Sequence, residues 1–399
     1  MRHLTALLAG TIYTPLQEIS EGVVLIEGPR IVRVGPKGKV KVPRGAEVID
    51  HRDGIIVPGF IDLHIHGAAG HEFMEGTSQA MSSVANFLAR RGTTSFLATT
   101  VTARLDDTLS AVRAMAGAIR AQRLFAQRRD GPVGAEILGI HFEGPFLSRK
   151  RRGAQPANYI RLPLVSLLRR LLDAAEGNGR ILTLAPELKG ALPLLKYARR
   201  RGLRVSIGHS DASLEEAERA INAGATHATH VFNAMRPFTH RDPGIIGAVL
   251  TDDRVCAELV CDGIHVHPGA VRLLARSKGL DHVVLVSDGG TGTGMPDGEY
   301  RISNFAVSII DGVCRNRQGN LAGSTVTLDV ELRNLMKYSG QPYARVLPCA
   351  TLNPARVLGL ETHKGLIAPG ADADLVALDP EYRVVQTYVR GRPVPHERV

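Results

Sequence analysis

His64 and His66 are the first residues in this chain whose types and spacing could bind a metal ion. Their segment, F-I-D-L-H-I-H at 60–66, is mostly apolar, which is typical of a buried strand. On a strand, residues two apart point to the same face, so both imidazoles could reach one divalent cation. The alternative is a pair of hydrogen-bonded histidines in the core, because histidine is often partly buried.

Glu143 ends a second apolar segment, G-I-H-F-E-G-P at 139–145. A buried carboxylate without a partner is costly, so this side chain needs a cation, either a metal ion or an arginine. His209 and His230 lie at the ends of two consecutive predicted strands. Together with Glu143 they form a His2Glu set, which is typical of a catalytic divalent ion that keeps a position for water. Local packing or helix capping is the alternative for either histidine alone.

Asp288 belongs to the segment S-D-G-G at 287–290, directly after the last strand of the predicted series. A carboxylate at this position could take a proton from metal-bound water and pass it to a leaving group. An isolated S-D-G segment would more often be an ordinary turn. The position after a strand, like that of the other candidate residues, favours the catalytic interpretation.

The elements that must position these residues alternate between strands and helices from about residue 58 to 365. Eight strands are predicted, near 62–65, 93–99, 136–142, 181–185, 204–207, 227–232, 255–260 and 282–286. Helices are predicted near 78–91, 105–129, 164–176, 190–201, 213–223 and 268–278, and again near 325–338, 342–349 and 353–358. This order predicts a (β/α)8 barrel of the TIM type, whose catalytic groups lie at the carboxyl ends of its strands.

The two ends of the chain have a different pattern. Residues 1–57 and 366–399 contain short apolar runs separated by turn residues, which predicts one small β-sandwich domain built from both termini. The barrel domain would then span 58–365. A glycine-rich stretch at about 290–323, with strand-like pieces at 303–309 and 312–315, is predicted to be an insertion in it.

Composition excludes several classes of protein. The 399 residues are 44% hydrophobic and 22% charged, as expected for a globular protein with a sizeable core. The net charge of +10 comes from scattered basic residues without a nucleic-acid-binding module, so we expect no nucleic-acid partner. The sequence has no apolar run long enough to span a membrane. Its four cysteines form no C-x-x-C pair, which favours a reducing, cytoplasmic location.

At these residues the sequence resembles the amidohydrolase superfamily and, within it, the N-acetylglucosamine-6-phosphate deacetylase family. The resemblance extends over almost the whole chain, and its most specific parts are H-x-E-G-P-F and T-H-x-F-N-A-M. The matching segments are P-G-F-I-D-L-H-I-H-G (58–67), H-F-E-G-P-F (141–146), G-H-S (208–210), T-H-V-F-N-A-M (229–235), D-G-I-H (262–265), S-D-G (287–289), L-A-G-S (321–324) and G-x-D-A-D-L-V (370–376).

The resemblance implies a metal-dependent hydrolase that removes acetate from N-acetylglucosamine 6-phosphate. It implies that the main metal is held by Glu143, His209 and His230. His64 and His66 match a second-metal pair that some members have. We therefore expect a divalent ion of the Zn, Fe, Mn or Co class, with one or two ions per subunit.

The same resemblance assigns the remaining roles. It makes Asp288 the general base and then the general acid. The residues that would contact the amino-sugar phosphate are Ala154, Gln155, Asn233, Ala234, His265, Leu321, Ala322 and Gly323. Many members have histidine at the position of Gln155, so a carbonyl-polarising role there is left open. Arg241 matches an arginine that binds the phosphate across a dimer interface, which implies a homodimer; otherwise it would be a surface charge.

Three alternatives remain. The substrate could be the epimer N-acetylgalactosamine 6-phosphate, which the sequence does not distinguish. It could be a cyclic amide or imide, although those members often use a lysine after the fourth strand, and here Lys189 lies further along the chain. The protein could also be a non-catalytic barrel that binds a sugar phosphate, since a fold does not determine a function. The presence of Asp288 and of the candidate ligands disfavours this last alternative.

Overall fold

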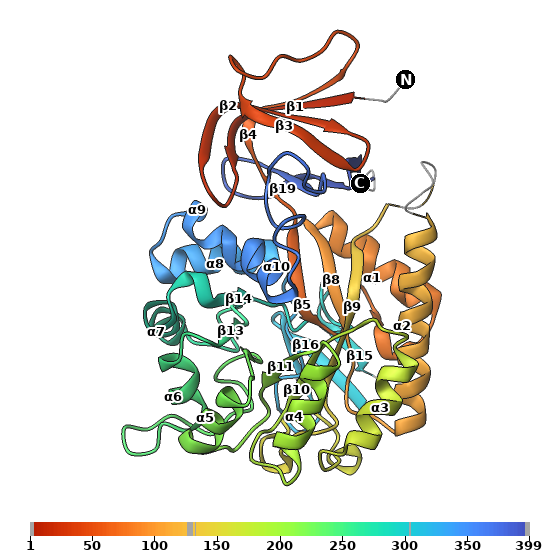
Figure 1. The fold of residues 1–399 in the computed structure, drawn as a ribbon, viewed down its shortest axis with the longest axis vertical. Helices are drawn as coiled ribbons and strands as arrows, with labels where there is room; N and C mark the ends of the chain where they lie inside the picture. Colours follow the sequence, from red (N-terminus) through yellow and green to blue (C-terminus); the bar gives the residue numbers. More distant parts are fainter. Residues whose placement is uncertain (1–3, 126–130, 132, 303–304, 396–399) are drawn as a thin grey trace.

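The computed structural model describes residues 4–125, 131, 133–302 and 305–395. Within this part of the chain, eight parallel strands are paired in sequence order and form a nearly closed barrel (Figure 1). This confirms the predicted (β/α)8 fold. The strands are β5 (Phe60–Ile65), β8 (Thr93–Thr99), β9 (Glu136–Glu143), β10 (Gly179–Leu184), β11 (Arg204–Ile207), β12 (His227–Ala228), β13 (Cys256–Leu259) and β14 (Val283–Leu285).

Helices surround the barrel, as the alternation in the sequence predicts. They are α1 (Ser78–Arg90), α2 (Leu105–Phe125), α3 (Val165–Ala174), α4 (Ala191–Arg200), α5 (Leu214–Asn222), α6 (Gly244–Thr251) and α7 (Pro268–Lys278). The sequence did not predict α6, because its residues from Gly244 to Leu250 are all buried and leave no polar face. The end of the helix predicted at 105–129 lies partly outside the described residues. Among those residues, no helix is both long and apolar enough to cross a membrane.

The barrel closes where its first and last strands meet. The backbone N–H of Asp288 donates to the carbonyl of His64 at 2.9 Å, and that of His66 donates to Gly289 at 2.7 Å. Below these bonds, the buried carboxylate of Asp62 accepts a hydrogen bond of 2.6 Å from the Ser287 hydroxyl. The closure therefore holds Asp288 directly beside the two histidines of β5.

Both ends of the chain contribute to one seven-stranded sheet of the described residues, as predicted. β4 lies at its centre and pairs in parallel with β1 and antiparallel with β18. The two halves share an apolar core that includes Leu7, Ile26 and Leu375, so the sheet bends into a sandwich (Figure 1). The strands are β1 (Leu4–Tyr13), β2 (Glu18–Glu27), β3 (Arg30–Pro36), β4 (Glu47–Pro58), β18 (Leu375–Leu378), β19 (Val384–Val389) and β20 (Arg392–Pro393).

A buried lysine connects this sheet to the barrel. The ammonium of Lys364 lies 2.7 Å from a carboxylate oxygen of Asp374, 2.8 Å from Glu136 on β9, and 3.1 Å from Asp372. Three acids around one cation hold the C-terminal segment against β9. The domain boundaries predicted at 57/58 and 365/366 remain a prediction; β4 runs to Pro58 and β18 begins at Leu375.

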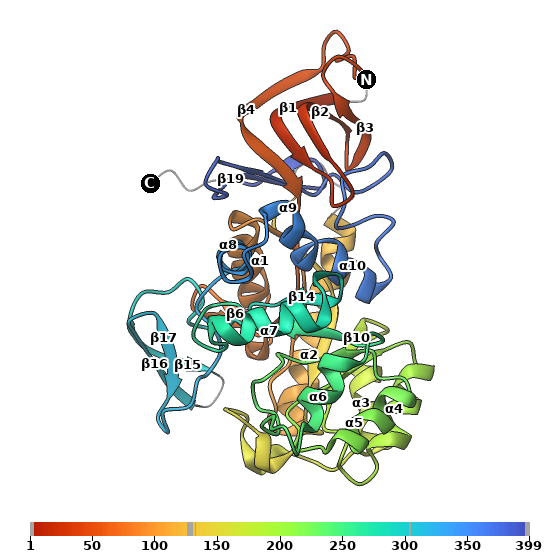
Figure 2. The same ribbon diagram turned by 90° about the vertical axis from the view of Figure 1, so that its left-hand side faces the viewer.

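The predicted insertion contains a small antiparallel sheet that stands out from the side of the barrel (Figure 2). It consists of β15 (Gly298–Ile302), β16 (Phe305–Ile310) and β17 (Val313–Asn316). β15 was not predicted, and residues 303–304 of the predicted strand at 303–309 lie outside the described residues. A short hairpin follows β5, with strands β6 (Gly67–Ala68) and β7 (His71–Glu72), and the helices after the insertion are α8 (Leu328–Ser339), α9 (Tyr343–Val346) and α10 (Leu352–Leu358).

Glu331 on α8 is a fully buried acid whose protonation links stability to pH. Burial raises the pKa of its carboxyl group well above the usual value, and the nearby acids Asp262 and Asp62 raise it further. The folded protein keeps this proton at pH values where the unfolded chain has released it. The protonated carboxyl group therefore contributes its full stability below the pKa of the unfolded chain, and this stability is lost as pH rises towards the folded pKa. We expect Glu331→Gln to remove this dependence of the free energy of unfolding on pH, which reaches about 1.4 kcal/mol per pH unit in the wild type.

Urea unfolding of both proteins across this pH window measures the effect. The stability of the wild type relative to Glu331→Gln should fall steadily as pH rises from the normal glutamate pKa towards neutrality. Parallel pH profiles for the two proteins would contradict the prediction.

Candidate metal centre and active site

Three predicted ligands from three different strands meet at the carboxyl-end rim of the barrel. The Nε2 atoms of His209 and His230 each lie 3.1 Å from Oε1 of Glu143, and they lie 3.1 Å from each other. All three side chains are buried. Glu143 is the last residue of β9, whereas both histidines follow the ends of their strands. The strand predicted at 227–232 is shorter in the structure, because the chain leaves the sheet after Ala228 and so turns His230 into the rim.

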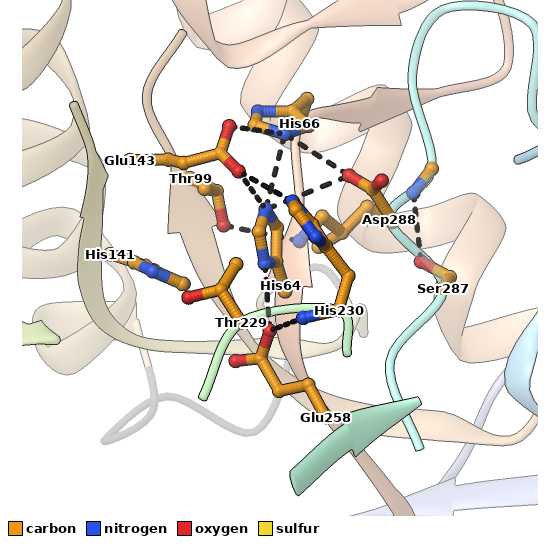
Figure 3. Close-up of polar contacts among 12 residues, drawn as sticks. His64, His66, Thr99, His141, Glu143, Thr229, His230, Glu258, Ser287 and Asp288 are labelled. Atoms are coloured by element: carbon orange, nitrogen blue, oxygen red, sulfur yellow. Dashed lines mark hydrogen bonds and ion pairs between the residues drawn. The ribbon is translucent and has the colours of Figure 1, made fainter. Parts of the chain in front are cut away.

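A second group lies on the other side of Glu143 and includes His64, His66 and Asp288 (Figure 3). The two Nε2 atoms of the histidines are 3.3 Å apart. Oδ1 of Asp288 lies 3.6 Å from Nε2 of His64 and 3.3 Å from Nε2 of His66. Glu143 faces both groups, because its Oε1 is 3.3 Å from His64 and its Oε2 is 3.4 Å from His66. The carboxylate of Glu143 therefore joins the two sets of candidate ligands.

Three of these residues adopt a left-handed backbone conformation that is unusual for side chains other than glycine. The φ angles are 45° for His209, 28° for His230 and 46° for Asp288. Each such residue costs about 1–3 kcal/mol, which the surrounding structure must offset. The strain occurs where a strand ends and the side chain must turn inward to the rim, as expected at a functional site.

Hydrogen bonds on the far side of two rings indicate which nitrogen carries a proton. Nδ1 of His209 lies 3.0 Å from the carbonyl oxygen of Arg151, and Nδ1 of His64 lies 3.0 Å from Oε2 of Glu258. In each pair, the ring N–H donates to the oxygen, so in the neutral ring the lone pair is on Nε2. Both lone pairs then point to the centre of the rim, as a metal ion requires.

Charges at the rim shift the pKa values of its members. Burial raises the pKa of Glu143, but the charges of His64 and His209, together with hydrogen bonds, hold it well below its usual value. Burial lowers the pKa of His64, yet Glu143 raises it well above normal. Burial also raises the pKa of Asp288, but a hydrogen bond from His66 and the nearby imidazoles lower it to about 2. The acids are thus ionised at neutral pH and attract positive charge.

A divalent metal ion fits this set of donor atoms. Metal–nitrogen and metal–oxygen distances for zinc are about 2.0–2.2 Å, and three atoms 3.1 Å apart can all reach one ion at that distance. Two facing Nε2 atoms repel each other unless a proton or a cation lies between them. A cation would replace the protons that the charged acids otherwise draw onto the imidazoles. Glu143, His209 and His230 could hold one ion, and His64, His66 and Asp288 another.

A cavity opens above the rim and brings together almost all of the predicted substrate residues. It is lined by Ala154, Gln155, Asn233, Ala234, His265, Leu321, Ala322 and Gly323, together with His66, Glu143, His209, His230 and Asp288. His64 lies beneath it and is fully buried. The ring of His265 is oriented by Asp262, whose Oδ2 lies 2.6 Å from Nδ1. The loop at 321–323 reaches the cavity from the end of the insertion.

Gln155 is held in a defined orientation in this cavity. Its side-chain oxygen accepts a hydrogen bond of 2.8 Å from the backbone N–H of Thr102, and its amide nitrogen donates to Oε2 of Glu143. Oε2 of Glu143 thus faces Gln155 and His66, whereas Oε1 faces His64, His209 and His230. Gln155 thus contacts a candidate metal ligand directly.

Arg241 is the predicted substrate-binding residue that does not line the cavity. It is exposed on the loop between Met235 and α6, which also carries the exposed side chain of Phe238. Among the described residues that line the cavity there is no lysine or arginine. A phosphate in this cavity would therefore face no lysine or arginine from the described residues of the same chain.

Sequence reasoning missed several residues that support the site from below. Glu258 on β13 contacts His64, and Asp62 on β5 binds Ser287 at the barrel closure. A signal for Glu258 was present, because a charged residue interrupts the apolar strand V-C-A-E-L-V at 255–260. Its partners could not be found in the same way, because they lie on strands far away in the sequence.

Comparison with known proteins identifies the family. The model of the amidohydrolase family matches residues 55–394. The chain is 37% identical over 349 residues to an N-acetylglucosamine-6-phosphate deacetylase of Lysinibacillus sphaericus, with 88% of each chain covered. It is 36% identical over 345 residues to an N-acetylgalactosamine-6-phosphate deacetylase of Escherichia coli O157:H7, covering 86% of this chain and 89% of the other.

Among solved structures, a mutant N-acetyl-D-glucosamine-6-phosphate deacetylase from Mycobacterium smegmatis, in complex with N-acetyl-D-glucosamine 6-phosphate, superimposes with a TM-score of 0.91. The two sequences are 33% identical, and the match covers 99% of this chain and 100% of the other. Such similarity over nearly the full length extends to both the barrel and the sheet formed by the termini. The chain belongs to the amidohydrolase family, in the group that contains the N-acetylglucosamine-6-phosphate deacetylases.

Proposed function

We propose that this protein is a metal-dependent deacetylase that hydrolyses the acetamide of N-acetyl-D-glucosamine 6-phosphate to D-glucosamine 6-phosphate and acetate. The observation that carries the proposal is the convergence of Glu143, His209 and His230 within 3.1 Å at one rim, opposite Asp288. The matches to deacetylases over most of the chain support the choice of substrate. A non-catalytic barrel would have no need for an ionised Asp288 beside a set of imidazole nitrogens that face one another.

In this proposal Glu143, His209 and His230 hold the main divalent ion, of the Zn, Fe, Mn or Co class, and His64 and His66 hold a second. A bound ion of this kind polarises the amide carbonyl and lowers the pKa of water. The protein residues around it hold the amide in place and exclude bulk water from the rim. The proposed location of this reaction is the cytoplasm.

Asp288 moves the proton that the reaction requires. Its pKa of about 2 keeps it ionised at neutral pH, so it can accept a proton from the attacking water. The water oxygen forms a bond to the carbonyl carbon, and the carbon–nitrogen bond breaks. Asp288 then returns the proton to the leaving nitrogen, which departs as the amine of the sugar, while the acetyl group leaves as acetate.

The cavity residues are proposed to bind the sugar. Asn233 and Ala234 face the sugar phosphate, while His265, oriented by Asp262, binds the sugar near the reacting amide. The loops at 154–155 and 321–323 cover the remaining sides of the ring. With the cavity residues in these roles, no lysine or arginine among the described lining residues is left to bind the phosphate dianion.

The missing cation is proposed to come from a second copy of the chain. Arg241 is exposed on a loop outside its own cavity, and a guanidinium group binds phosphate oxygens in a fork. In a symmetric dimer, each loop at 236–243 would place Arg241 at the cavity of its neighbour. The active enzyme is thus proposed to be a homodimer.

The epimer N-acetylgalactosamine 6-phosphate is a second candidate substrate, because the relative from Escherichia coli O157:H7 that is named for it is 36% identical. The two sugars differ only in the configuration of one hydroxyl group. We expect purified protein loaded with Zn²⁺ to release acetate from the glucosamine compound with the higher kcat/KM. A higher kcat/KM for the galactosamine compound would reverse the assignment, and no release from either would reject the deacetylase.

Substitution of Asp288 tests its role as the proton carrier. We expect Asp288→Asn to lower kcat by about 10²–10⁴-fold, because general acid–base catalysis contributes that much and an amide cannot accept the proton. Metal analysis should still find the ion held by Glu143, His209 and His230. Asp253→Asn, an exposed residue before β13 at the opposite end of the barrel, is the control and should keep full activity. Near-normal turnover of Asp288→Asn would remove Asp288 from its proposed role.

Mixed dimers test whether Arg241 acts across an interface. We expect Arg241→Ala alone to raise KM by about 10–100-fold, the effect of losing a charge-assisted hydrogen bond. When this variant and Asp288→Asn are co-expressed, a mixed dimer contains one complete site, so activity should recover to about one quarter of the wild-type value. Each variant expressed alone is the control. A mixture that is no more active than the variants alone would show that Arg241 does not cross to a neighbour.

A further inference from the structure

Glu258 is a buried acid at the centre of the barrel that the proposed reaction does not use. It lies on β13 with no solvent exposure and does not line the cavity, so it cannot touch a substrate. A carboxylate in this position would be strongly unfavourable without compensation. Burial raises the pKa of Glu258, but the charge of His64 and hydrogen bonds from the surrounding histidines hold it well below its usual value. The side chain is therefore an anion within the barrel.

Three hydrogen bonds compensate this charge. Nδ1–H of His64 donates to Oε2 at 3.0 Å, and the backbone N–H of His230 donates to the same oxygen at 3.1 Å (Figure 3). Nε2–H of His227 donates to Oε1 at 2.9 Å. Oε2 of Glu258 thus accepts a hydrogen bond from one residue of each candidate ligand group, His64 in one and His230 in the other. The acid contacts both groups of ligands from the side away from the substrate.

The contact with His64 has a chemical consequence. An acceptor at Nδ1 keeps the proton on that nitrogen and leaves the lone pair of Nε2 pointing to His66 and Asp288. The neighbouring ring of His141 cannot replace Glu258 as the acceptor for the Nδ1 proton of His64, although the centroids of the two rings lie 4.6 Å apart. Its two nitrogens are already engaged, with the carbonyl of Leu63 at 2.9 Å and the hydroxyl of Thr183 at 2.8 Å.

We propose that Glu258 is a positioning residue that fixes the tautomer and ring orientation of His64 and thereby makes the subsite of His64 and His66 able to hold the second divalent ion. This inference rests on the proposed two-ion site. Because the acid contacts His230 only through its backbone, the main ion held by Glu143, His209 and His230 depends on it less. Loss of Glu258 should therefore weaken the two sites unequally.

The experiment titrates metal-free protein with Zn²⁺ by calorimetry and compares Glu258→Met with the wild type. Methionine has a similar length but provides no acceptor for His64. We expect the affinity for the first ion to be unchanged within a few-fold and that for the second to fall by about 10–100-fold, the usual effect of removing a partner of a ligand histidine. Glu258→Gln keeps an oxygen for His64 and should weaken the second ion by less than about tenfold.

Glu331→Gln is the matched control, because it replaces another fully buried glutamate that none of the observed hydrogen bonds connects to a candidate ligand. It should bind both ions as the wild type does. A folded Glu258→Met protein that binds two ions with wild-type affinities would overturn the inference. If the wild type itself binds a single ion, the two-ion site fails and this inference fails with it. A wild type with two ions and no effect of Glu258 would leave the proposed function intact.

A measurement on the wild type covers the case in which Glu258→Met does not fold. Nitrogen-15 NMR of labelled histidines, with the signals of His64 assigned by their loss in His64→Asn, reports which ring nitrogen carries the proton in the zinc-loaded protein. We expect a proton on Nδ1 of His64 and none on Nε2. A proton on Nε2 would overturn the proposed role of Glu258.

Discussion

The attraction between one carboxylate and the histidines on either side of it organises this structure. Glu143 faces His209 and His230 through one oxygen, and that oxygen also faces His64. Removing these groups from water is costly, so the arrangement persists only because the charges are close together and the remaining nitrogens and oxygens have partners. A divalent ion satisfies the same requirement better than protons do, because it binds several lone pairs at once.

Hydrogen-bond donors, rather than burial alone, decide the charge of the acids inside the barrel. Glu258 and Glu331 are both fully buried. The charge of His64 and three hydrogen-bond donors hold the pKa of Glu258 well below normal, whereas burial raises the pKa of Glu331 well above normal and nearby acids raise it further. The protein thus contains a favoured anion below the candidate metal centre and, near the closure, an acid whose ionisation is disfavoured. The anion increases the basicity of the adjoining imidazole, which favours binding of a cation.

The proposed separation of the reaction from phosphate binding agrees with the same charge pattern. The rim collects carboxylates and imidazoles to attract a cation, and a lysine or arginine beside them would compete for the carboxylates. Among the described cavity residues, uncharged side chains and histidines line the space beside the carboxylates instead. A cation for an anionic substrate is better supplied from outside the rim, at a distance from Glu143. The exposed position of Arg241 is consistent with that requirement.

By itself, the sequence determined the barrel, the sheet shared by the two termini, and the candidate ligands, because strand periodicity and short motifs are local signals. It missed α6, because an almost entirely buried helix has no polar face. It also predicted that β12 continues to Phe232, because Val231 and Phe232 extend the apolar run into the turn that orients His230. Only the tertiary structure decided that Glu258 lies between His64 and His227, and that Asp62 holds Ser287 at the closure. Those pairs join strands far apart in the chain, and the closing of the barrel, which no local pattern encodes, is what brings them into contact.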